Sequence, residues 1–255
     1  MKASAIQGSG VRSVSGTMLH VQDLSAMAAW YGEILGVTVK EIASEKPYYE
    51  FDMNNGVNLM LDDHRFMQDE LQHPQFMLKT LDIDKTYAWV KQNDIPIVLD
   101  IQKVHEGLTY FNIFDPEGNV LMIIESDWVN PSPIVPNAAN HPITNRIQCI
   151  VVPVIDLKRA TEWYARLLGH SIKPERQDGG PIYWFDMDNG TGVLLDDNRN
   201  HRDWGKFPSF MLNASNINEA YRFMQDKKAR ILMDIQHEHH FFAADPEGNA
   251  IIICL

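Results

Sequence analysis

Cysteine and long apolar runs are both scarce in this sequence. Its 255 residues include two cysteines, Cys149 and Cys254, which are too few for a disulfide framework and lack the Cys-x-x-Cys spacing of structural zinc. No apolar run approaches the roughly 18 residues that a membrane-spanning helix requires. Residues 1–10 are rich in Ser and Gly, unlike a secretory signal. We therefore expect a cytoplasmic protein with no membrane segment.

Basic residues are also under-represented. Twenty-two Lys and Arg against 34 Asp and Glu give a formal net charge of −12. Because a binder of the phosphate backbone needs a basic face, we expect no nucleic-acid partner. The acidic excess is uneven: residues 1–130 contain 9 bases and 19 acids, whereas residues 131–255 contain 13 bases and 15 acids. An acidic first half would favour a cationic ligand by electrostatic steering.

An internal repeat organises the chain. Residues 51–65 read FDMNNGVNLMLDDHR and residues 185–199 read FDMDNGTGVLLDDNR, with 9 of 15 positions identical. Shorter motifs recur in the same order: Asp-Leu at 23–24 and 156–157, Trp-Tyr at 30–31 and 163–164, Leu-Gly at 35–36 and 168–169, and Asp-Pro-Glu-Gly-Asn at 115–119 and 245–249. The distance in sequence between equivalent residues of the two copies is 134 at the 51–65 motif and 130 at the Asp-Pro-Glu-Gly-Asn motif. The second copy has therefore lost four residues in the preceding hairpin.

A proline-rich segment separates the two copies. It contains Pro131, Pro133 and Pro136, which cannot donate to a strand ladder or continue a helix. We predict a first domain at residues 1–130, a linker at 131–141 and a second domain at 142–255.

Each copy alternates short strands with single helices. Asp23 predicts a helix N-cap, Gly36 predicts that helix's end, and Asp84 predicts a second N-cap. Asn54-Asn55-Gly56 predicts a hairpin, and residues 115–119 predict a turn. The strands expected in the first copy are residues 14–21, 37–42, 48–53, 57–61, 76–80, 97–101, 108–114 and 120–124. This pattern is typical of an α+β fold made of four βαβββ modules, two in each copy.

These motifs resemble those of a known superfamily. A strand ending in Asp-Leu, a helix with Trp-Tyr and Leu-Gly, and a closing strand pair joined by Asp-Pro-Glu-Gly-Asn resemble the vicinal oxygen chelate superfamily of glyoxalases, bleomycin-resistance proteins and extradiol dioxygenases. The resemblance covers nearly all of the chain, twice. It implies two cup-shaped, open, mixed sheets with helices on the convex side. It also implies a metal or a ligand on the concave face.

The resemblance also identifies where the superfamily's metal enzymes place their ligands, which are His or Gln on the first strand of each module and Glu on the last. In this sequence those positions hold Gly16, Met60, Gln75, Met122, Cys149, Leu194, Ser209 and Ile252. Only Gln75 is a residue type of that ligand set, and one weak oxygen donor cannot hold a divalent ion. We therefore predict no cofactor, with a divalent metal at a relocated site as the alternative.

The segment His237-Glu238-His239-His240 is the only local cluster with metal-ligand chemistry. On a strand, His237 and His239 would share one face and His240 would take the other, which suits a two-histidine site. The simpler interpretation is a set of surface histidines in a shortened hairpin.

Alternation along the strands predicts which side chains share the concave face with these positions. In the first copy they are largely thioether and aromatic with a few polar groups, which is typical of a small-molecule pocket. An ordinary filled core is the alternative. The predicted ligand-binding residues are Met18, His20, Met60, Asp62, Gln75, Met77, Tyr110, Asn112 and Met122. The side chains on the equivalent face of the second copy are smaller and more apolar, so we expect the first copy to be the one that binds the ligand. The second-copy face consists of Cys149, Val151, Leu194, Asp196, Ser209, Met211, His240, Phe242 and Ile252.

Three of these residues are candidates for catalysis. His20 and Asp62 could form the histidine–carboxylate pair that a general base requires, and Tyr110 is a further candidate. The motif Leu-Asp-Asp-x-Arg occurs at residues 61–65 and 195–199. We interpret it as structural, one Asp capping the following loop and the Arg pairing with the other Asp, with ligand binding at the rim as the alternative.

The sequence thus predicts a protein that binds a small, cationic organic molecule without the usual metal, as drug-sequestering members of the superfamily do. One alternative is an enzyme of the superfamily, a lyase, isomerase or ring-cleaving dioxygenase, with a relocated metal or with metal-free acid–base chemistry. A scaffold with both cups filled is the other. The sequence allows a monomer or a homodimer.

Overall fold

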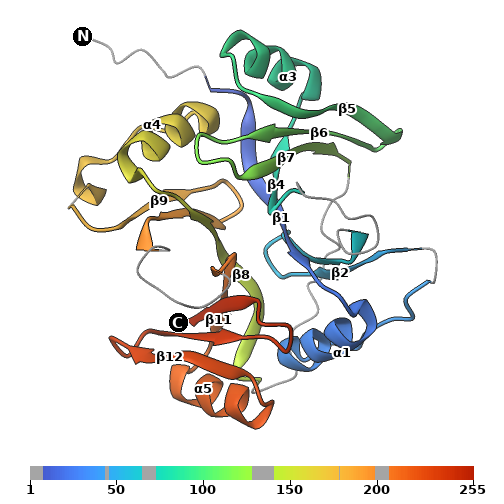
Figure 1. Ribbon diagram of the computed structural model, residues 1–255, viewed down its shortest axis with the longest axis vertical. Helices are drawn as coiled ribbons and strands as arrows, with labels where there is room; N and C mark the ends of the chain where they lie inside the picture. Colours follow the sequence, from blue (N-terminus) through green and yellow to red (C-terminus); the bar gives the residue numbers. More distant parts are fainter. Residues whose placement is uncertain (1–7, 44–45, 65–72, 128–140, 178, 199–206) are drawn as a thin grey trace. The chain divides into compact units, whose positions relative to one another are not determined.

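The computed structural model describes residues 8–43, 46–64, 73–127, 141–177, 179–198 and 207–255. In these ranges the chain forms two seven-stranded mixed sheets and four α-helices (Figure 1). The α+β fold class predicted from the sequence is confirmed. The predicted linker, apart from His141, lies outside the described residues.

The first copy forms one open sheet with the strand order β2-β3-β1-β4-β7-β6-β5. Strands β1 and β3 are parallel, whereas β2 and β3 are antiparallel. The elements are β1 (Val11–His20), α1 (Leu24–Leu35), β2 (Tyr48–Asp52), β3 (Asn58–Asp62), β4 (Phe76–Thr80), α3 (Ile83–Gln92), β5 (Ile97–His105), β6 (Leu108–Phe114) and β7 (Val120–Ser126).

The second copy repeats this arrangement, with the strand order β12-β13-β14-β11-β8-β10-β9. Read from β9, this is the order of the first sheet. The elements are β8 (Ile143–Pro153), α4 (Leu157–Leu168), the 3₁₀ turn η1 (Pro174–Arg176), β9 (Ile182–Asp186), β10 (Gly192–Asp196), β11 (Phe210–Ala214), α5 (Ile217–Asp226), β12 (Arg230–Gln236), β13 (His240–Ala244) and β14 (Ala250–Cys254).

The helix ends follow local sequence signals, with one correction. The Asp23 carboxylate accepts a hydrogen bond from the backbone N–H three residues on, and Gly36 ends α1 in the left-handed region with φ 65°. The predicted N-cap at Asp84 is wrong. Asp82 caps α3, because its carboxylate accepts the Lys85 N–H at 2.9 Å. Asp84 lies in the first turn, where a negative charge suits the helix dipole.

The strand expected at residues 37–42 does not form. The backbone N–H of Lys40 donates to the Tyr49 hydroxyl at 3.0 Å, and in the second copy the N–H of Lys173 donates to the Tyr183 hydroxyl at 2.8 Å. Because a side chain takes this backbone donor, the segment does not extend a strand ladder. Within the described ranges, the first module of each copy therefore has three strands instead of the predicted four.

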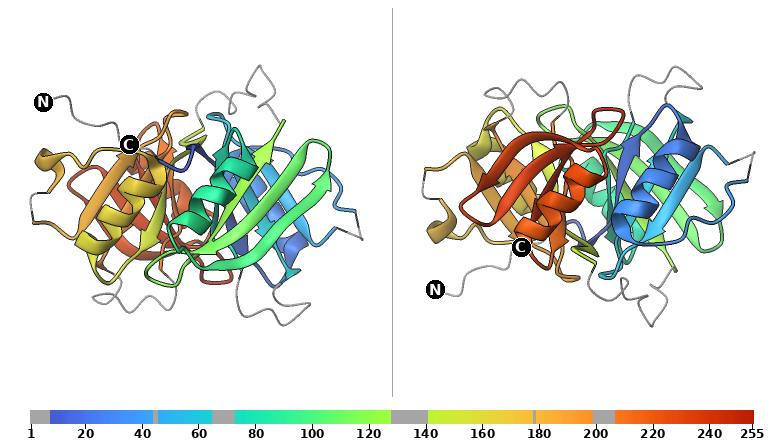
Figure 2. Two further views of the ribbon diagram at one scale, coloured as in Figure 1. Left: turned by 90° about the horizontal axis from the view of Figure 1, so that it is seen from above. Right: turned by 90° about the horizontal axis from the view of Figure 1, so that it is seen from below.

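Packing groups the chain into two compact units, each containing a module from both copies. Unit 1 comprises Met1–Ser15, Pro74–Val129 and Val152–Arg202, and unit 2 comprises Gly16–His73, Asn130–Val151 and Asp203–Leu255. In unit 1, α3 packs on β6 and β7, and in unit 2, α5 packs on β12, β13 and β14 (Figure 2). Among the described residues, no helix has the length and apolar character needed to cross a membrane.

The Asp-Pro-Glu-Gly-Asn turn of the first copy binds the second copy within unit 1. The Asp115 carboxylate accepts the Tyr164 hydroxyl at 2.9 Å. The Glu117 carboxylate accepts the backbone N–H of Ile155 at 2.8 Å and pairs with Arg159 at 2.5 Å. This places a negative charge at the start of α4, where the helix dipole stabilises it.

Unit 2 contains the reciprocal arrangement. The Asp245 carboxylate accepts the Tyr31 hydroxyl at 3.1 Å, and Glu247 accepts the backbone N–H groups of Gln22 and Asp23 at 2.7 and 2.8 Å. The Trp-Tyr and Asp-Pro-Glu-Gly-Asn motifs of one copy therefore bind the complementary motifs of the other. Their recurrence has a structural explanation, independent of any ligand.

The helix-facing side of each sheet forms the core. Phe111 on β6 is fully buried and contacts Tyr87 of α3, with ring centroids 5.1 Å apart. Phe241 on β13 contacts Tyr221 of α5 at the same centroid distance. Because side chains alternate along a strand, the neighbours of Phe111 and Phe241 project from the opposite face, where the candidate site residues lie.

Candidate functional site

Five predicted ligand-binding residues lie in unit 1: Gln75, Met77, Tyr110, Asn112 and Met122. Asn112 is opposite Met122 in the β6–β7 pairing, and Met77 is beside Met122 in the β4–β7 pairing. Tyr110 and Asn112 flank the helix-facing Phe111, so both project from the face away from α3. We call Met77, Tyr110, Asn112 and Met122 the thioether face.

Asn112 is the most unusual residue of the thioether face. It is 7% exposed, and its side-chain carbonyl has no hydrogen-bond partner among the described residues. A buried acceptor without a partner costs about 1–3 kcal/mol. Tyr110 and Met122 on the same face are half-buried, so this part of the sheet is not closed over like the helix-facing core.

The second copy differs at the equivalent positions. Phe242 takes the place of Asn112 and Ile252 that of Met122, and the two are paired across β13 and β14 as their counterparts are across β6 and β7. Ile252 is 1% exposed, whereas Met122 is half-buried. The second-copy pair is therefore more apolar, and its exposure is reversed: Ile252 is buried where Met122 is half-buried, and Phe242 is half-buried where Asn112 is buried.

The other four predicted ligand-binding residues lie in unit 2. Met18 is opposite Met60 and His20 is opposite Asp62 in the parallel pairing of β1 and β3. Met18 and Asp62 are each 7% exposed, whereas His20 and Met60 are half-buried. Alternation placed these four on one face, but their role in ligand binding stays a prediction.

Asp62 has a partner that sequence reasoning missed. Its Oδ1 atom accepts the backbone N–H of His64 at 2.7 Å and lies 3.1 Å from the Nδ1 atom of the same residue. Burial raises the pKa of Asp62, and the hydrogen bonds and charge of His64 oppose that rise. The ring of His20 packs edge-on against His73, with centroids 3.7 Å apart. The predicted pairing of His20 with Asp62 stays a prediction.

The Leu-Asp-Asp-x-Arg motif has the same local structure in both copies. In the second copy, the Oδ1 atom of Asp196 accepts the backbone N–H and the side-chain amide of Asn198, both at 2.8 Å. The first Asp therefore caps the following loop, in agreement with the structural interpretation. The arginines, Arg65 and Arg199, lie outside the described residues. His64 occupies the variable position of this motif, which is why the pattern gave no signal for it.

The predicted strand geometry of the histidine cluster is wrong. His237 and Glu238 have φ values of 51° and 56°, and the N–H of His239 donates to the carbonyl of Gln236 at 2.9 Å. These residues form the turn between β12 and β13, because two positive φ values match the twist of a tight hairpin. This hairpin is shorter than its counterpart in the first copy: β12 and β13 have 7 and 5 residues, whereas β5 and β6 have 9 and 7.

In the second copy, the side chains at the positions of the superfamily's metal ligands do not fit the metal that the resemblance implies. Cys149 is fully buried beside Met211, and Met211 is beside Ile252. A thiol, a thioether and an aliphatic group are not the nitrogen and oxygen set of a hard or borderline divalent ion. Across the described ranges, no group of three or more His, Cys, Asp or Glu side chains is arranged to hold a metal ion.

His240 should make folding stability sensitive to acid. Burial lowers its pKa, and the neighbouring His239 and His237 lower it further. Because the pKa is lower in the folded chain than in the unfolded chain, where it is about 6.5, His240 contributes stability above that pH and loses it as the pH falls. In His240→Tyr, which carries the residue that the first copy has at this position, the urea midpoint should fall less between about pH 7.5 and about pH 5.5. Equal acid sensitivity in both proteins would contradict this assignment.

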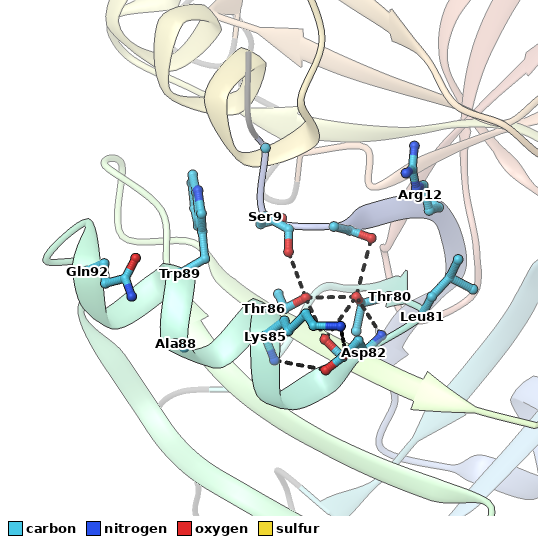
Figure 3. Close-up of a pocket in the computed structure, with 12 residues that line it drawn as sticks. Ser9, Arg12, Thr80, Leu81, Asp82, Lys85, Thr86, Ala88, Trp89 and Gln92 are labelled. Atoms are coloured by element: carbon cyan, nitrogen blue, oxygen red, sulfur yellow. Dashed lines mark hydrogen bonds and ion pairs between the residues drawn. The ribbon is translucent and has the colours of Figure 1, made fainter. Parts of the chain in front are cut away.

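A cavity of about 410 Å³ lies in unit 1 beside the start of α3 (Figure 3). No predicted site residue lines it. Its polar groups bond one another: the Thr86 hydroxyl is 2.8 Å from the Ser9 carbonyl and 2.7 Å from the Thr80 hydroxyl, and Lys85 pairs with Asp82 at 2.7 Å. We interpret this network as the anchor of residues 8–10 on α3, not as a ligand site.

Comparisons with known proteins agree with the fold. A family model described as the Glyoxalase/Bleomycin resistance protein/Dioxygenase superfamily matches residues 14–123 and 146–253. Similar solved structures include a catechol 2,3-dioxygenase (16% identity, TM-score 0.61, covering 96% of this chain and 92% of that chain). A second is the 2,3-dioxygenase LapB from Pseudomonas sp. KL28 (12% identity, TM-score 0.62, covering 96% of this chain and 92% of that chain). A third is a Mn(II)-bound glyoxalase from Novosphingobium aromaticivorans (12% identity, TM-score 0.59, covering 95% of this chain and 81% of that chain). At these identities the likeness shows the fold alone. No curated protein matches the sequence significantly.

Proposed function

The chain belongs to the Glyoxalase/Bleomycin resistance protein/Dioxygenase superfamily, and from this premise we propose that it binds a small organic ligand on the thioether face of the first copy. The observation that carries the proposal is the buried Asn112 carbonyl, which has no partner among the described residues. Such an acceptor suits a ligand that presents an N–H or O–H donor. The surrounding methionines and Tyr110 suit its apolar body and can adapt to its shape.

The charge of the chain supports a cationic ligand. Residues 1–130 contain 9 bases and 19 acids, and such an excess attracts cations and repels anions over about a Debye length. An aromatic ammonium or amidine combines a positive charge, an N–H donor and an apolar body. We infer a cytoplasmic binding protein for molecules of this class, acting without the metal of the superfamily's enzymes.

A fluorescent cation tests this function directly. Proflavine is planar, positively charged and carries amine N–H donors. Titration should show saturable 1:1 binding that weakens with salt, whereas the anionic dye 1-anilinonaphthalene-8-sulfonate should bind much more weakly. Stronger binding of the anion, or no saturable binding of the cation, would contradict the proposal.

The variant Asn112→Leu removes the acceptor while keeping a similar side-chain volume. It should weaken proflavine binding about tenfold to hundredfold, because a hydrogen bond to a charged donor contributes about 1.5–3 kcal/mol. The matched control is Phe242→Leu, at the equivalent position of the second copy, which should leave the affinity unchanged. A loss of binding in Phe242→Leu but not in Asn112→Leu would move the site to the second copy.

A further inference from the structure

Asp62 and His64 form a histidine–carboxylate pair in unit 2. The Asp62 side chain is 10% exposed, and the His64 side chain is 39% exposed. A carboxylate can only accept, so the 3.1 Å contact between His64 Nδ1 and Asp62 Oδ1 is a hydrogen bond donated by the ring. The neutral ring then carries its lone pair on Nε2. A carboxylate that fixes the tautomer of a partly exposed imidazole is the arrangement of a general base.

Comparison with the second copy shows which part of this motif is structural and which part is found only in the first copy. Asp196 caps its loop in the same way as Asp62, but Asn198 stands where His64 stands, and its amide makes the side-chain contact with the carboxylate. An asparagine therefore satisfies the turn. The imidazole of His64 adds a proton acceptor that the fold itself does not need.

Two more histidines distinguish the first copy in the same region. His20 is opposite Asp62 in the strand register, and its ring contacts His73. The repeat places Pro153 and Phe207 at the equivalent positions of the second copy. All three histidines of this region are therefore replaced by side chains that do not titrate, whereas the aspartate is retained.

We propose that Asp62 and His64 act as a general-base dyad that removes an acidic proton from a small organic substrate. In this step the substrate C–H bond breaks and its electron pair stays on the substrate. The proton forms a new bond to Nε2 of His64, and the Asp62 carboxylate stabilises the resulting imidazolium. No oxidant, reductant or metal is needed. Suitable substrates carry a C–H group next to a carbonyl, an imine or an electron-poor heterocycle.

This proposal does not rest on the ligand-binding function. The dyad belongs to unit 2, whereas the thioether face belongs to unit 1. Variants at His64 and at Asn112 therefore test separate claims.

The test uses 5-nitrobenzisoxazole, which requires only a base. Removal of its C–H proton drives the electron pair into a new C≡N bond, breaks the N–O bond and releases a coloured phenolate. The wild-type protein should give a kcat/KM at least about tenfold above that of His64→Asn. Its rate should rise with pH, because only the unprotonated base can accept the proton. The titrating neighbours that bear on this pH dependence are Asp62, Asp63, His20 and His73.

Two controls separate catalysis from structure. His64→Asn carries the residue of the second copy, so its urea midpoint should match the wild type. His239→Asn, at an exposed turn, should keep the wild-type rate. Asp62→Asn should lower the rate about threefold or more and displace the rise of the rate with pH, because the imidazolium loses its counter-charge. A wild-type rate equal to that of His64→Asn at every pH, or a pH profile unchanged in Asp62→Asn, would overturn the dyad.

Discussion

Replacing Asp115 by alanine should lower the free energy of unfolding by about 3–4 kcal/mol. Its carboxylate accepts four hydrogen bonds, from the backbone N–H groups of Glu117 and Asn119, the Asn119 amide and the Tyr164 hydroxyl. Alanine leaves several of these donors buried without partners, and each costs about 1–3 kcal/mol. Burial and the neighbouring carboxylate raise the pKa of Tyr164, so its hydroxyl stays a donor.

Asp245→Ala should cause a loss of similar size, because Asp245 has the same four kinds of partner in unit 2. Urea denaturation followed by circular dichroism measures both losses. Glu106→Ala, at an exposed turn residue, is the control and should stay within about 0.5 kcal/mol of the wild type.

A double-mutant cycle isolates the contact between the copies. Tyr164→Phe keeps the buried ring and removes only the hydroxyl, so it should cost about 1–2 kcal/mol. In Asp115→Ala/Tyr164→Phe the two losses should sum to more than the measured loss, because both changes remove the same hydrogen bond. Strict additivity, or a loss below about 1 kcal/mol in Asp115→Ala, would mean that the hydrogen bond between Asp115 and Tyr164 contributes nothing to stability.

The turn and its role differ in how far the sequence could predict them. The backbone N–H of Asp115 bonds the carbonyl of Asn119 only four residues away, so its residues alone identify it. Its contact with Tyr164 spans 49 positions, and a pattern that occurs twice does not state which copy meets which. The reciprocal pairing of the motifs therefore required the structure.

The missing strand at residues 37–42 shows another limit of local patterns. The alternating valines Val37 and Val39 favour a strand, but Val39 lies over Gly32 of α1, where an added Cβ would approach it to 2.4 Å. The Tyr49 hydroxyl binds a backbone donor of the same segment. Val39 and the backbone N–H of this segment thus make tertiary contacts with α1 and Tyr49 in place of the sheet contacts that the sequence pattern predicted.

Alternation depends only on strand geometry, so the sequence alone could assign the side chains of a strand to its two faces. It could not predict that Asn112 is buried without a partner or that Met122 is half-buried, since both depend on what covers the face. His64 was missed for a different reason. It lies beyond the end of β3 at Asp62, where strand alternation no longer relates a side chain to the sheet.

Asn112 and Phe242 should respond in opposite directions to changes in polarity. Asn112→Leu should raise the free energy of unfolding by about 1–2 kcal/mol, because it removes a buried acceptor that has no partner among the described residues. Phe242→Asn should lower it by about 2–3 kcal/mol, because it removes apolar contact with the buried Ile252 and places an amide beside that side chain. Urea midpoints of the two single variants measure both effects.

The sign of the Asn112 effect decides between a binding site and a structural residue. A residue held by the fold loses stability when its polar group is removed, so a loss of more than about 1 kcal/mol in Asn112→Leu would identify the amide as structural. A gain in stability together with weaker proflavine binding would mean that the Asn112 amide lowers the stability of the free protein and that a bound ligand offsets this loss. Proflavine at a concentration near its wild-type Kd should then stabilise the wild type by RT ln(1 + [L]/Kd) and leave the midpoint of Asn112→Leu almost unchanged.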